Sequence, residues 1–159
     1  MLLEEARELA HELMSDYGLY YWKFTFDYAK TRFGCCNEYT KTISLSKYLV
    51  LINEEEVVKN VILHEIAHAL VGNKHKHTSI FKQKAIEIEC EFTSRYVNEN
   101  INTVPKNVVA NCPRCGRLFA RYRKPKTKRC CAKCSDVPYE MRLLQFKRTD
   151  EISSKEMAR

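Results

Sequence analysis

The chain has 159 residues, of which 45% are hydrophobic and 30% are charged, and it contains only 4 Gly and 4 Pro. This composition excludes a collagen-like or low-complexity chain and argues against a wholly disordered one. The formal net charge is +7. No apolar run is long enough to span a bilayer, so we expect no membrane partner.

The first elements in chain order are a helix and two strands. Residues 2–17 have apolar side chains at helical spacing, and Gly18 can end this helix. Residues 20–30 alternate aromatic and polar side chains, which predicts a strand with one buried face. A second strand is expected over residues 42–45. The aromatic residues expected on the buried face are Tyr20, Trp22, Phe24, Phe26 and Tyr28.

The middle of the chain predicts a central buried helix. Asn53 followed by Glu56 matches an N-terminal capping box, and Gly72 provides a stop, so this helix is expected over residues 54–71. It is apolar on most sides, which is typical of a buried helix. A further helix is expected over residues 78–97. Because helices and strands are grouped rather than strictly alternating, the predicted fold class is α+β.

The predicted central helix contains the motif His64-Glu65-Ile66-Ala67-His68. Residues four apart lie on one helix face, so the two imidazoles can bind one metal ion. Leaving three polar groups without partners inside this apolar helix would be costly, which favours a zinc site over incidental histidines. In such a motif the glutamate is a general base rather than a ligand, so we expect Glu65 to be catalytic.

A catalytic zinc ion needs a third protein ligand. The candidates that follow the motif are His75, His77, Glu87 and Glu91. The chain can turn back toward the site after Gly72, which favours one of the two histidines. The residues alone do not choose between them.

Two CxxC pairs predict a second metal site. Cys112 and Cys115 precede Cys131 and Cys134 at a separation of 15 residues, which is typical of a Cys₄ zinc ribbon. A segment of this size has too little core to fold alone, so a structural zinc ion is expected to drive its folding. The remaining cysteines, expected to lie outside this site, are Cys35, Cys36, Cys90 and Cys130.

The excess positive charge lies in the same segment. Residues 111–134 carry 9 basic and no acidic residues, whereas residues 1–110 carry 13 basic and 15 acidic residues. This asymmetry predicts contact with DNA phosphates, with Phe119 or Tyr122 stacking on an unpaired base. The alternative is that these rings pack the ribbon and the charges are only solvated. The expected DNA-contacting residues are Arg117, Arg121, Arg123, Lys124, Lys126, Lys128 and Arg129.

These motifs together resemble the SprT-like family of zinc metalloproteases. The residues that carry the resemblance are Trp22-Lys-Phe24, Ala29 to Cys35, Ile43 to Ser46, His64 to Leu70, and His77 followed by Phe81. The resemblance implies a zincin-like domain of a few strands packed on helices, with His64, His68 and His77 as zinc ligands and Glu65 as the catalytic residue. The chain departs from the family at Thr78-Ser79, where many members have Gly-Pro.

The resemblance also implies an activity, since better-studied relatives are DNA-dependent proteases that degrade proteins crosslinked to DNA. We therefore expect a zinc-dependent endopeptidase of DNA-crosslink repair, with one catalytic and one structural zinc ion and with DNA and DNA-bound proteins as partners. The alternative is a non-enzymatic DNA-binding or regulatory protein with a structural or vestigial histidine site. A third possibility is a metallopeptidase whose ribbon only stabilises the fold.

The expected organisation is a metalloprotease domain (1–104), a zinc ribbon (105–138) and a polar tail (139–159), although residues 137–146 could pack on the body. Residues 1–6 lack the basic region and apolar core of a secretory signal, so we expect a cytoplasmic protein, associated with the nucleoid in a bacterium or phage. Disulfides are rare in such a reducing compartment, which again favours metal ligation for the cysteines.

Overall fold

The computed structural model describes residues 1–91 and 101–150 and divides the chain into two compact units, Met1–Val104 and Pro105–Arg159. The first unit holds the histidine motif and the second holds the paired cysteines. Within the described ranges, no helix has the length and apolar character needed to cross a membrane.

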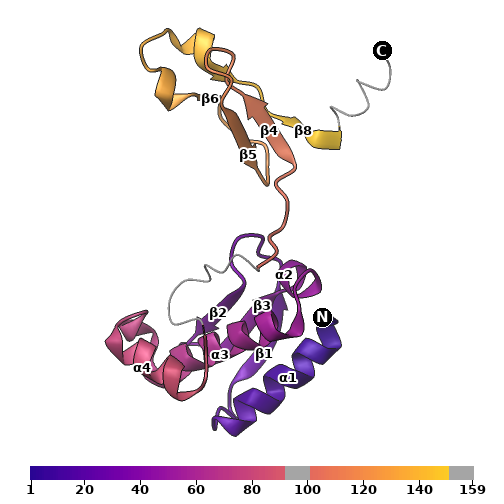
Figure 1. The fold of residues 1–159 in the computed structure, drawn as a ribbon, viewed down its shortest axis with the longest axis vertical. Coiled ribbons are helices and arrows are strands. Elements are labelled where there is room, and N and C mark those ends of the chain that lie inside the picture. The colour runs from indigo at the N-terminus through magenta and orange to yellow at the C-terminus, as the bar shows by residue number, and fades with distance from the viewer. Residues whose placement is uncertain (92–100, 151–159) are drawn as a thin grey trace. The chain divides into compact units, whose positions relative to one another are not determined.

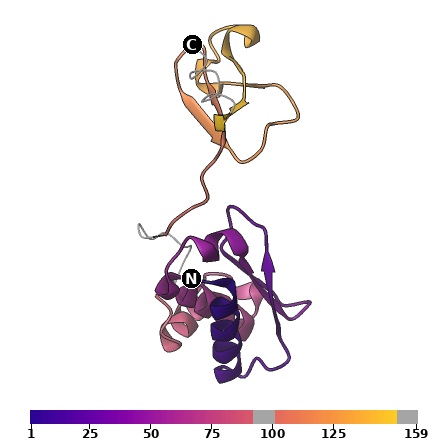
Figure 2. The ribbon, with the colours of Figure 1, turned by 90° about the vertical axis from the view of Figure 1, so that its right-hand side faces the viewer.

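The first unit is a small mixed sheet with helices on one side of it (Figure 2). Its helices are α1 (Leu3–Asp16), α2 (Lys47–Leu51), α3 (Glu55–Val71) and α4 (Ser79–Glu87), and its strands are β1 (Lys23–Asp27), β2 (Gly34–Asn37) and β3 (Thr42–Ser46). The order in the sheet is β1-β3-β2, with β1 parallel and β2 antiparallel to β3. Strand β2 is therefore at the edge of the sheet.

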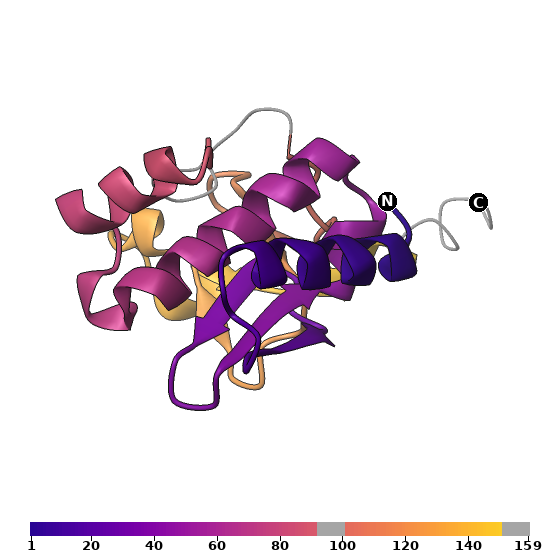
Figure 3. The same ribbon diagram turned by 90° about the horizontal axis from the view of Figure 1, so that it is seen from below.

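Helix α3 is the centre of the first unit. It contacts α1, α4, β2 and β3, and it lies with α1 over the sheet (Figures 1 and 3). Its buried apolar side chains contribute about 1.5–3 kcal/mol each when they leave water. These side chains are Val58, Val61, Ile62, Leu63 and Ile66. The prediction of a central buried helix is confirmed.

The expected capping box at the start of α3 is wrong. The N-cap is Glu54, and Asn53 is buried with only 2% of its surface exposed. The Asn53 amide donates hydrogen bonds to the carbonyls of Leu49 and Asn102, at 2.7 and 3.0 Å, and its oxygen accepts one from the Asn102 N–H. Asn53 therefore ties α2 to the end of the first unit instead of capping α3.

Two other elements are shorter than expected. Strand β1 covers only Lys23–Asp27, so Tyr20 and Tyr28 lie outside it and are 72% and 67% exposed. Among the expected aromatic residues Phe24 is buried. Helix α4 ends at Glu87, and residues 92–97 of the expected helix lie outside the described residues. The edge strand β2 had no clear sequence signal.

The second unit contains two small sheets. Its strands are β4 (Val108–Asn111), β5 (Leu118–Arg121), β6 (Arg129–Cys130), β7 (Leu143–Leu144) and β8 (Lys147–Arg148). One sheet has the order β5-β4-β8, and the other pairs β6 with β7. The short 3₁₀ helices of this unit are Ala132–Cys134 and Tyr139–Arg142. The buried core residues are Ala110, Cys112, Cys131, Cys134 and Leu144.

The expected tail begins later than the sequence suggested. Residues 139–148 supply β7, β8 and the buried Leu144, and so they belong to the second unit. The Cys131 N–H donates to the Arg142 carbonyl at 3.0 Å, and the Arg142 guanidinium donates to the Cys131 carbonyl at 3.1 Å. This segment therefore supports the second cysteine pair. Residues 151–159 lie outside the described residues.

Candidate metal centres

Three histidines come together at the C-terminal half of α3. His64 and His68 project from consecutive turns of α3, and His77 follows a short 3₁₀ turn, Asn73–His75. One nitrogen from each ring lies within 4.8 Å of the other two. The Nε2 atoms of His64 and His77 are 3.1 Å apart. The structure thus gathers all three histidines that the family resemblance implied.

Phe81 on α4 packs against all three rings. Its ring centroid lies 4.8 Å from that of His64, 4.3 Å from that of His68 and 5.0 Å from that of His77. Phe81 is fully buried. One aromatic side chain therefore limits the positions open to each imidazole, which explains why a phenylalanine four residues after His77 is a useful sequence signal.

The other candidates for a third ligand are not in this cluster. His75 is half-buried and ends the 3₁₀ turn, where its N–H donates to the Gly72 carbonyl at 3.1 Å. Glu87 is exposed and pairs with Lys84 at 2.6 Å. Glu91 is also exposed. Of the four candidates, the structure brings only His77 to His64 and His68.

The turn that carries His77 is fastened to the edge strand of the sheet. Gly72 ends α3 with a φ of +83°, a conformation that favours glycine. The Asn73 N–H donates to the Glu38 carboxylate at 2.9 Å, and the Asn73 amide donates to the Cys36 carbonyl at 3.3 Å. Sequence reasoning missed Glu38 and Asn73, because their role depends on two segments about 35 residues apart in the chain.

Glu65 lies beside the histidines on the same helix and is 4% exposed. Its side chain faces Gly34 at the start of β2: a Cβ at Gly34 would lie 2.6 Å from Glu65 Oε1 and 2.7 Å from its Cγ. Only a glycine therefore leaves room for this carboxylate. The structure places the expected catalytic residue between the histidine helix and the edge strand.

The histidine cluster fits a zinc ion. Zn–N bonds of about 2.0–2.1 Å at tetrahedral angles place ligand nitrogens roughly 3.3–3.4 Å apart, close to the 3.1 Å between His64 and His77. Burial, with smaller effects of the His64 and His77 rings, lowers the pKa of His68 to about 4, which keeps this ring neutral as a ligand must be. The His68 Nδ1 is buried without a hydrogen-bond partner.

The four cysteines of the two CxxC pairs also form a cluster. Their sulfur atoms all lie within 4.8 Å of one another. The Sγ atoms of Cys112 and Cys134 are 4.0 Å apart, and those of Cys115 and Cys131 are 3.9 Å apart. Four Zn–S bonds of about 2.3 Å at tetrahedral angles would separate the sulfurs by roughly 3.8 Å. The donor set and its spacing fit a structural zinc ion.

Backbone geometry supports the first cysteine pair. Gly116 has a φ of +68°, and its N–H donates to the Cys112 carbonyl at 2.9 Å. A hydrogen bond from the Arg117 backbone N–H lowers the pKa of the Cys115 thiol to about 7, which favours the thiolate that binds metal.

The remaining cysteines lie outside the four-sulfur cluster. Cys130 is half-buried in β6, Cys35 and Cys36 are half-buried in β2, and Cys90 is buried in the first unit. Burial and the nearby Glu65 carboxylate raise the pKa of Cys36 to about 12, so its thiol stays protonated at neutral pH.

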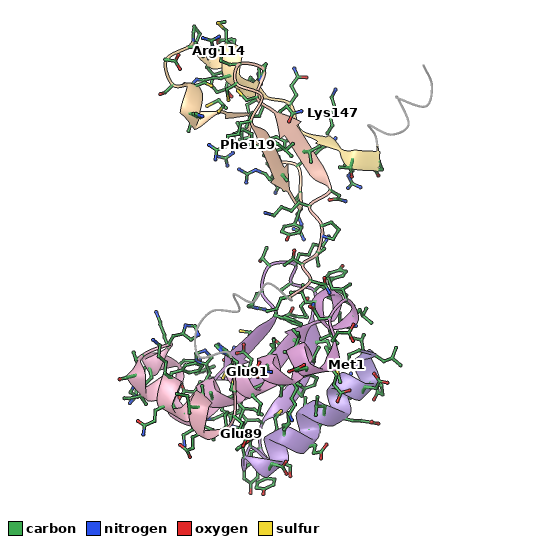
Figure 4. All side chains as sticks on the ribbon, viewed as in Figure 1. Met1, Glu89, Glu91, Arg114, Phe119 and Lys147 are labelled. Atoms are coloured by element: carbon green, nitrogen blue, oxygen red, sulfur yellow. The ribbon has the colours of Figure 1, made fainter. Side chains whose placement is uncertain are left out.

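The expected DNA-contacting side chains all lie at the surface of the second unit. Arg117 precedes β5 and Arg121 ends it, Arg129 begins β6, and the other four lie in the connection between these strands. All seven are exposed. In the three-stranded sheet of the second unit, Phe119 on β5 and Lys147 on β8 lie on either side of β4 (Figure 4).

Phe119 is a packing residue rather than a free stacking surface. It is half-buried against the core of the second unit, and the Arg117 guanidinium lies 5.6 Å from its ring centroid. Tyr122 is half-buried, with the Lys106 ammonium 5.8 Å from its ring centroid. For Phe119 the structure favours packing, and the charges remain the main feature of this surface.

Comparison with known proteins gives one family and several structures. The sequence model of the SprT-like family matches residues 6–105. The search of curated proteins gave no match. Among solved structures, the chain is similar to the metallopeptidase zymogen jannalysin of Methanocaldococcus jannaschii, with 21% identity and a TM-score of 0.46 over 60% of this chain and 85% of that chain. It is also similar to the metallopeptidase zymogen abylysin of Pyrococcus abyssi, with 23% identity and a TM-score of 0.44 over 60% of this chain and 84% of that chain.

Proposed function

The chain belongs to the SprT-like family and is a zinc metallopeptidase, and we propose that it is an endopeptidase whose substrates are proteins associated with or crosslinked to DNA. The observation that carries the proposal is the cluster of His64, His68 and His77 with the buried carboxylate of Glu65 beside it. On this proposal the protein is associated with the nucleoid when its source is a bacterium or a phage-infected cell.

The residues divide the chemistry between them. A zinc ion held by His64, His68 and His77 would supply a Lewis acid that polarises the scissile carbonyl and makes water more acidic. Glu65 takes the proton from the attacking water on a carboxylate oxygen and then delivers it to the leaving amine. Gly34 and the surrounding core hold that carboxylate in place and exclude bulk water from one side of it.

The edge strand offers a place for the substrate backbone. Strand β2 pairs with β3 along one side, and within the described residues no strand pairs with its other side. A peptide in extended conformation can add to such an edge through main-chain hydrogen bonds. Because Gly34 at the start of β2 contacts Glu65, a peptide bound along β2 would pass the catalytic carboxylate.

The exposed basic side chains of the second unit support the DNA part of the proposal. The stretch from residue 111 to residue 134 has 9 basic and no acidic residues. Each phosphate neutralised by such a residue releases condensed counterions, so binding should weaken steeply with salt. A plot of the logarithm of the binding constant against the logarithm of the salt concentration should have a slope of about −0.9 per phosphate contact on duplex DNA.

The proposal is tested by cleavage of a protein crosslinked to a DNA oligonucleotide, compared with the same protein free of DNA. The wild type should cleave the crosslinked protein faster, and Glu65→Gln should lose about 10²–10⁴-fold in rate while it keeps its zinc. Equal cleavage by the wild type and Glu65→Gln would show that Glu65 is not the general base. Equal rates of cleavage of the crosslinked and the DNA-free protein would contradict the proposal that DNA directs the enzyme to its substrate.

The role of the ribbon has a separate test. Replacing Arg121, Arg123, Lys124, Lys126 and Lys128 by Gln should weaken DNA binding and flatten its salt dependence. A matched control replaces five exposed basic residues of the first unit by Gln, namely Lys23, Lys41, Lys59, Lys76 and Lys82. If the ribbon variant binds DNA like the wild type, the ribbon only stabilises the fold.

A further inference from the structure

We propose that the catalytic unit carries its own site for single-stranded DNA, formed by Tyr28, Lys30, Lys47 and Tyr48. We call these four residues the tyrosine–lysine platform. The inference rests on the proposed function, because it assumes a DNA-bound substrate, and it adds a second DNA contact apart from the ribbon. Two of the residues follow β1 and the other two begin α2.

The four side chains form two interlocked cation–aromatic pairs. The rings of Tyr28 and Tyr48 meet edge to face, with centroids 6.0 Å apart and planes at 63°. The Lys47 ammonium lies 4.9 Å from the Tyr28 centroid and donates a hydrogen bond to the Tyr28 hydroxyl at 3.2 Å. The Lys30 ammonium lies 5.3 Å from the Tyr48 centroid. Each ring thus has a positive charge beside it.

The platform is open to solvent. Tyr28 is 67% exposed and Tyr48 is 38% exposed. Neither ring is needed to fill the core of the unit, which is formed by other residues. Aromatic rings that stay at the surface beside cations are the usual composition of a site that stacks unpaired bases and holds their phosphates.

The backbone beneath the platform is held in one conformation. The Ser46 hydroxyl donates to the Ala29 carbonyl at 2.5 Å, and the Ser46 N–H donates to the Phe33 carbonyl at 2.7 Å. The Ala29 N–H in turn donates to the Asp27 carboxylate at 2.9 Å. Ser46 immediately precedes Lys47 in the chain, so one residue links the two segments of the platform. A site fixed in advance loses less entropy on binding.

The local charge suits a polyanion. Residues 28–33 and 47–52 contain three basic and no acidic residues. The carboxylate that lies next to them, Asp27, already accepts hydrogen bonds from Arg32, at 2.5 Å, and from Ser44, at 3.1 Å. Asp27 is thus paired with donors other than Lys30 and Lys47, and the Lys47 ammonium keeps two N–H donors beyond the one that it gives to the Tyr28 hydroxyl.

The chemistry favours a single strand over a duplex. A base can stack on Tyr28 or Tyr48 only when its face is free, as it is in unpaired DNA. The segment that carries Tyr28 and Lys30 continues through Phe33 into Gly34, which contacts Glu65. Asp27 pairs with Ser46 and Gly34 pairs with Leu45, so the platform and Gly34 lie at the same end of β3. A DNA strand held on the platform would therefore lie near the edge strand of the active site, where a protein crosslinked to that DNA can be cleaved.

The test measures DNA binding by the full-length chain carrying Glu65→Gln, so that no cleavage intervenes. The probes are a fluorescent twelve-nucleotide oligothymidine and a hairpin duplex of matched charge, each titrated at several salt concentrations. Tyr28→Ala/Tyr48→Ala should bind the single strand about tenfold more weakly, or worse, while duplex affinity changes less than about twofold, because stacking contributes only to unpaired bases.

Matched variants show whether stacking is the cause. Tyr28→Phe/Tyr48→Phe keeps both rings and should bind the single strand like the parent. Tyr20→Ala/Tyr21→Ala removes two tyrosines of the same unit that are 72% and 92% exposed, and it should also bind normally. Thermal unfolding of each variant shows that the first unit is intact.

Three results would overturn the inference. The first is unchanged single-strand binding by Tyr28→Ala/Tyr48→Ala, and the second is an equal loss for the single strand and the duplex. The third is slower cleavage of a DNA-free protein when this pair of substitutions is made in the active enzyme, which would identify the platform as a protein-docking surface. If the parent chain binds no DNA, the proposed function fails as well; if only the alanine pair has no effect, the proposed function stands.

Discussion

Gly34 on β2 lies so close to Glu65 on α3 that no larger residue fits between the edge strand and the Glu65 carboxylate. A Cβ at position 34 would lie 2.6 Å from Glu65 Oε1 and 2.7 Å from Glu65 Cγ. Because Glu65 is buried, its side chain has little free space into which it can move. In the proposed mechanism, this contact couples the position of the general base, Glu65, to the strand β2 on which the substrate would bind.

Gly34→Ala should therefore impair catalysis more than folding. The added methyl group pushes the Glu65 carboxylate away, and displacement of a catalytic group by about 1 Å can cost about 100-fold in kcat/KM. Zinc content should stay at the wild-type level. The measurement is peptidase kinetics beside thermal unfolding, with Thr25→Ala, at an exposed position of β1, as the control. Wild-type kinetics in Gly34→Ala would mean that the carboxylate is not held by this contact.

His77→Ala should remove one zinc ion per chain, whereas His75→Ala should remove none. The reason is that His77 meets His64 and His68 and His75 does not. The measurement is metal content by mass spectrometry after dialysis, combined with peptidase activity. A loss of zinc in His75→Ala, with zinc retained in His77→Ala, would reverse the ligand assignment.

Cys131→Ser should unfold the second unit, and Cys130→Ser should leave it folded. Of these two cysteines, Cys131 belongs to the four-sulfur cluster and Cys130 does not. Zinc binding by such a cluster supplies about 10–16 kcal/mol of apparent folding free energy. Limited proteolysis should then cut Cys131→Ser within residues 105–150 and spare the first unit. If Cys130→Ser is the variant that is cut and loses zinc, the ligand pairing is shifted by one residue.

Asp27 should stabilise the first unit in a pH-dependent way. Burial favours the neutral acid, but hydrogen bonds from Ala29, Arg32 and Ser44 outweigh it and lower the pKa of Asp27 below 3.8. The contribution is therefore present above pH 3.8 and is lost as the pH falls through the lower pKa of the folded state.

The measurement for Asp27 is chemical unfolding of the wild type and Asp27→Asn at pH 7 and at pH 3. Because the side chain is 28% exposed, we expect a difference of about 1 kcal/mol at pH 7, and a smaller one at pH 3. Glu87→Gln, which breaks an exposed ion pair with Lys84, should change stability at neither pH. A difference between the wild type and Asp27→Asn that grows on acidification would contradict the assignment.

Local patterns were enough to predict the central helix and the chemistry it carries. The apolar run that ends at Gly72 predicted α3, because a helix that is apolar on most sides is typical of a buried central helix. Other local signals misled. Asn53 has the side chain of an N-cap, but its hydrogen bonds go to Leu49 and Asn102. A local motif could not reveal a partner 49 residues away.

The sequence by itself determined that the chain has one HExxH helix and one pair of CxxC motifs, because local spacing alone places His64 beside His68 and brings the two cysteines within each CxxC motif together. The tertiary structure decided which later histidine joins His64 and His68, since a turn fastened to β2 brings His77 there. It also decided that Gly34 holds Glu65, that residues 139–148 complete the second unit, and that Tyr28 meets Tyr48. Each of these contacts joins segments distant in the chain, and the packing of the whole unit fixes their distances.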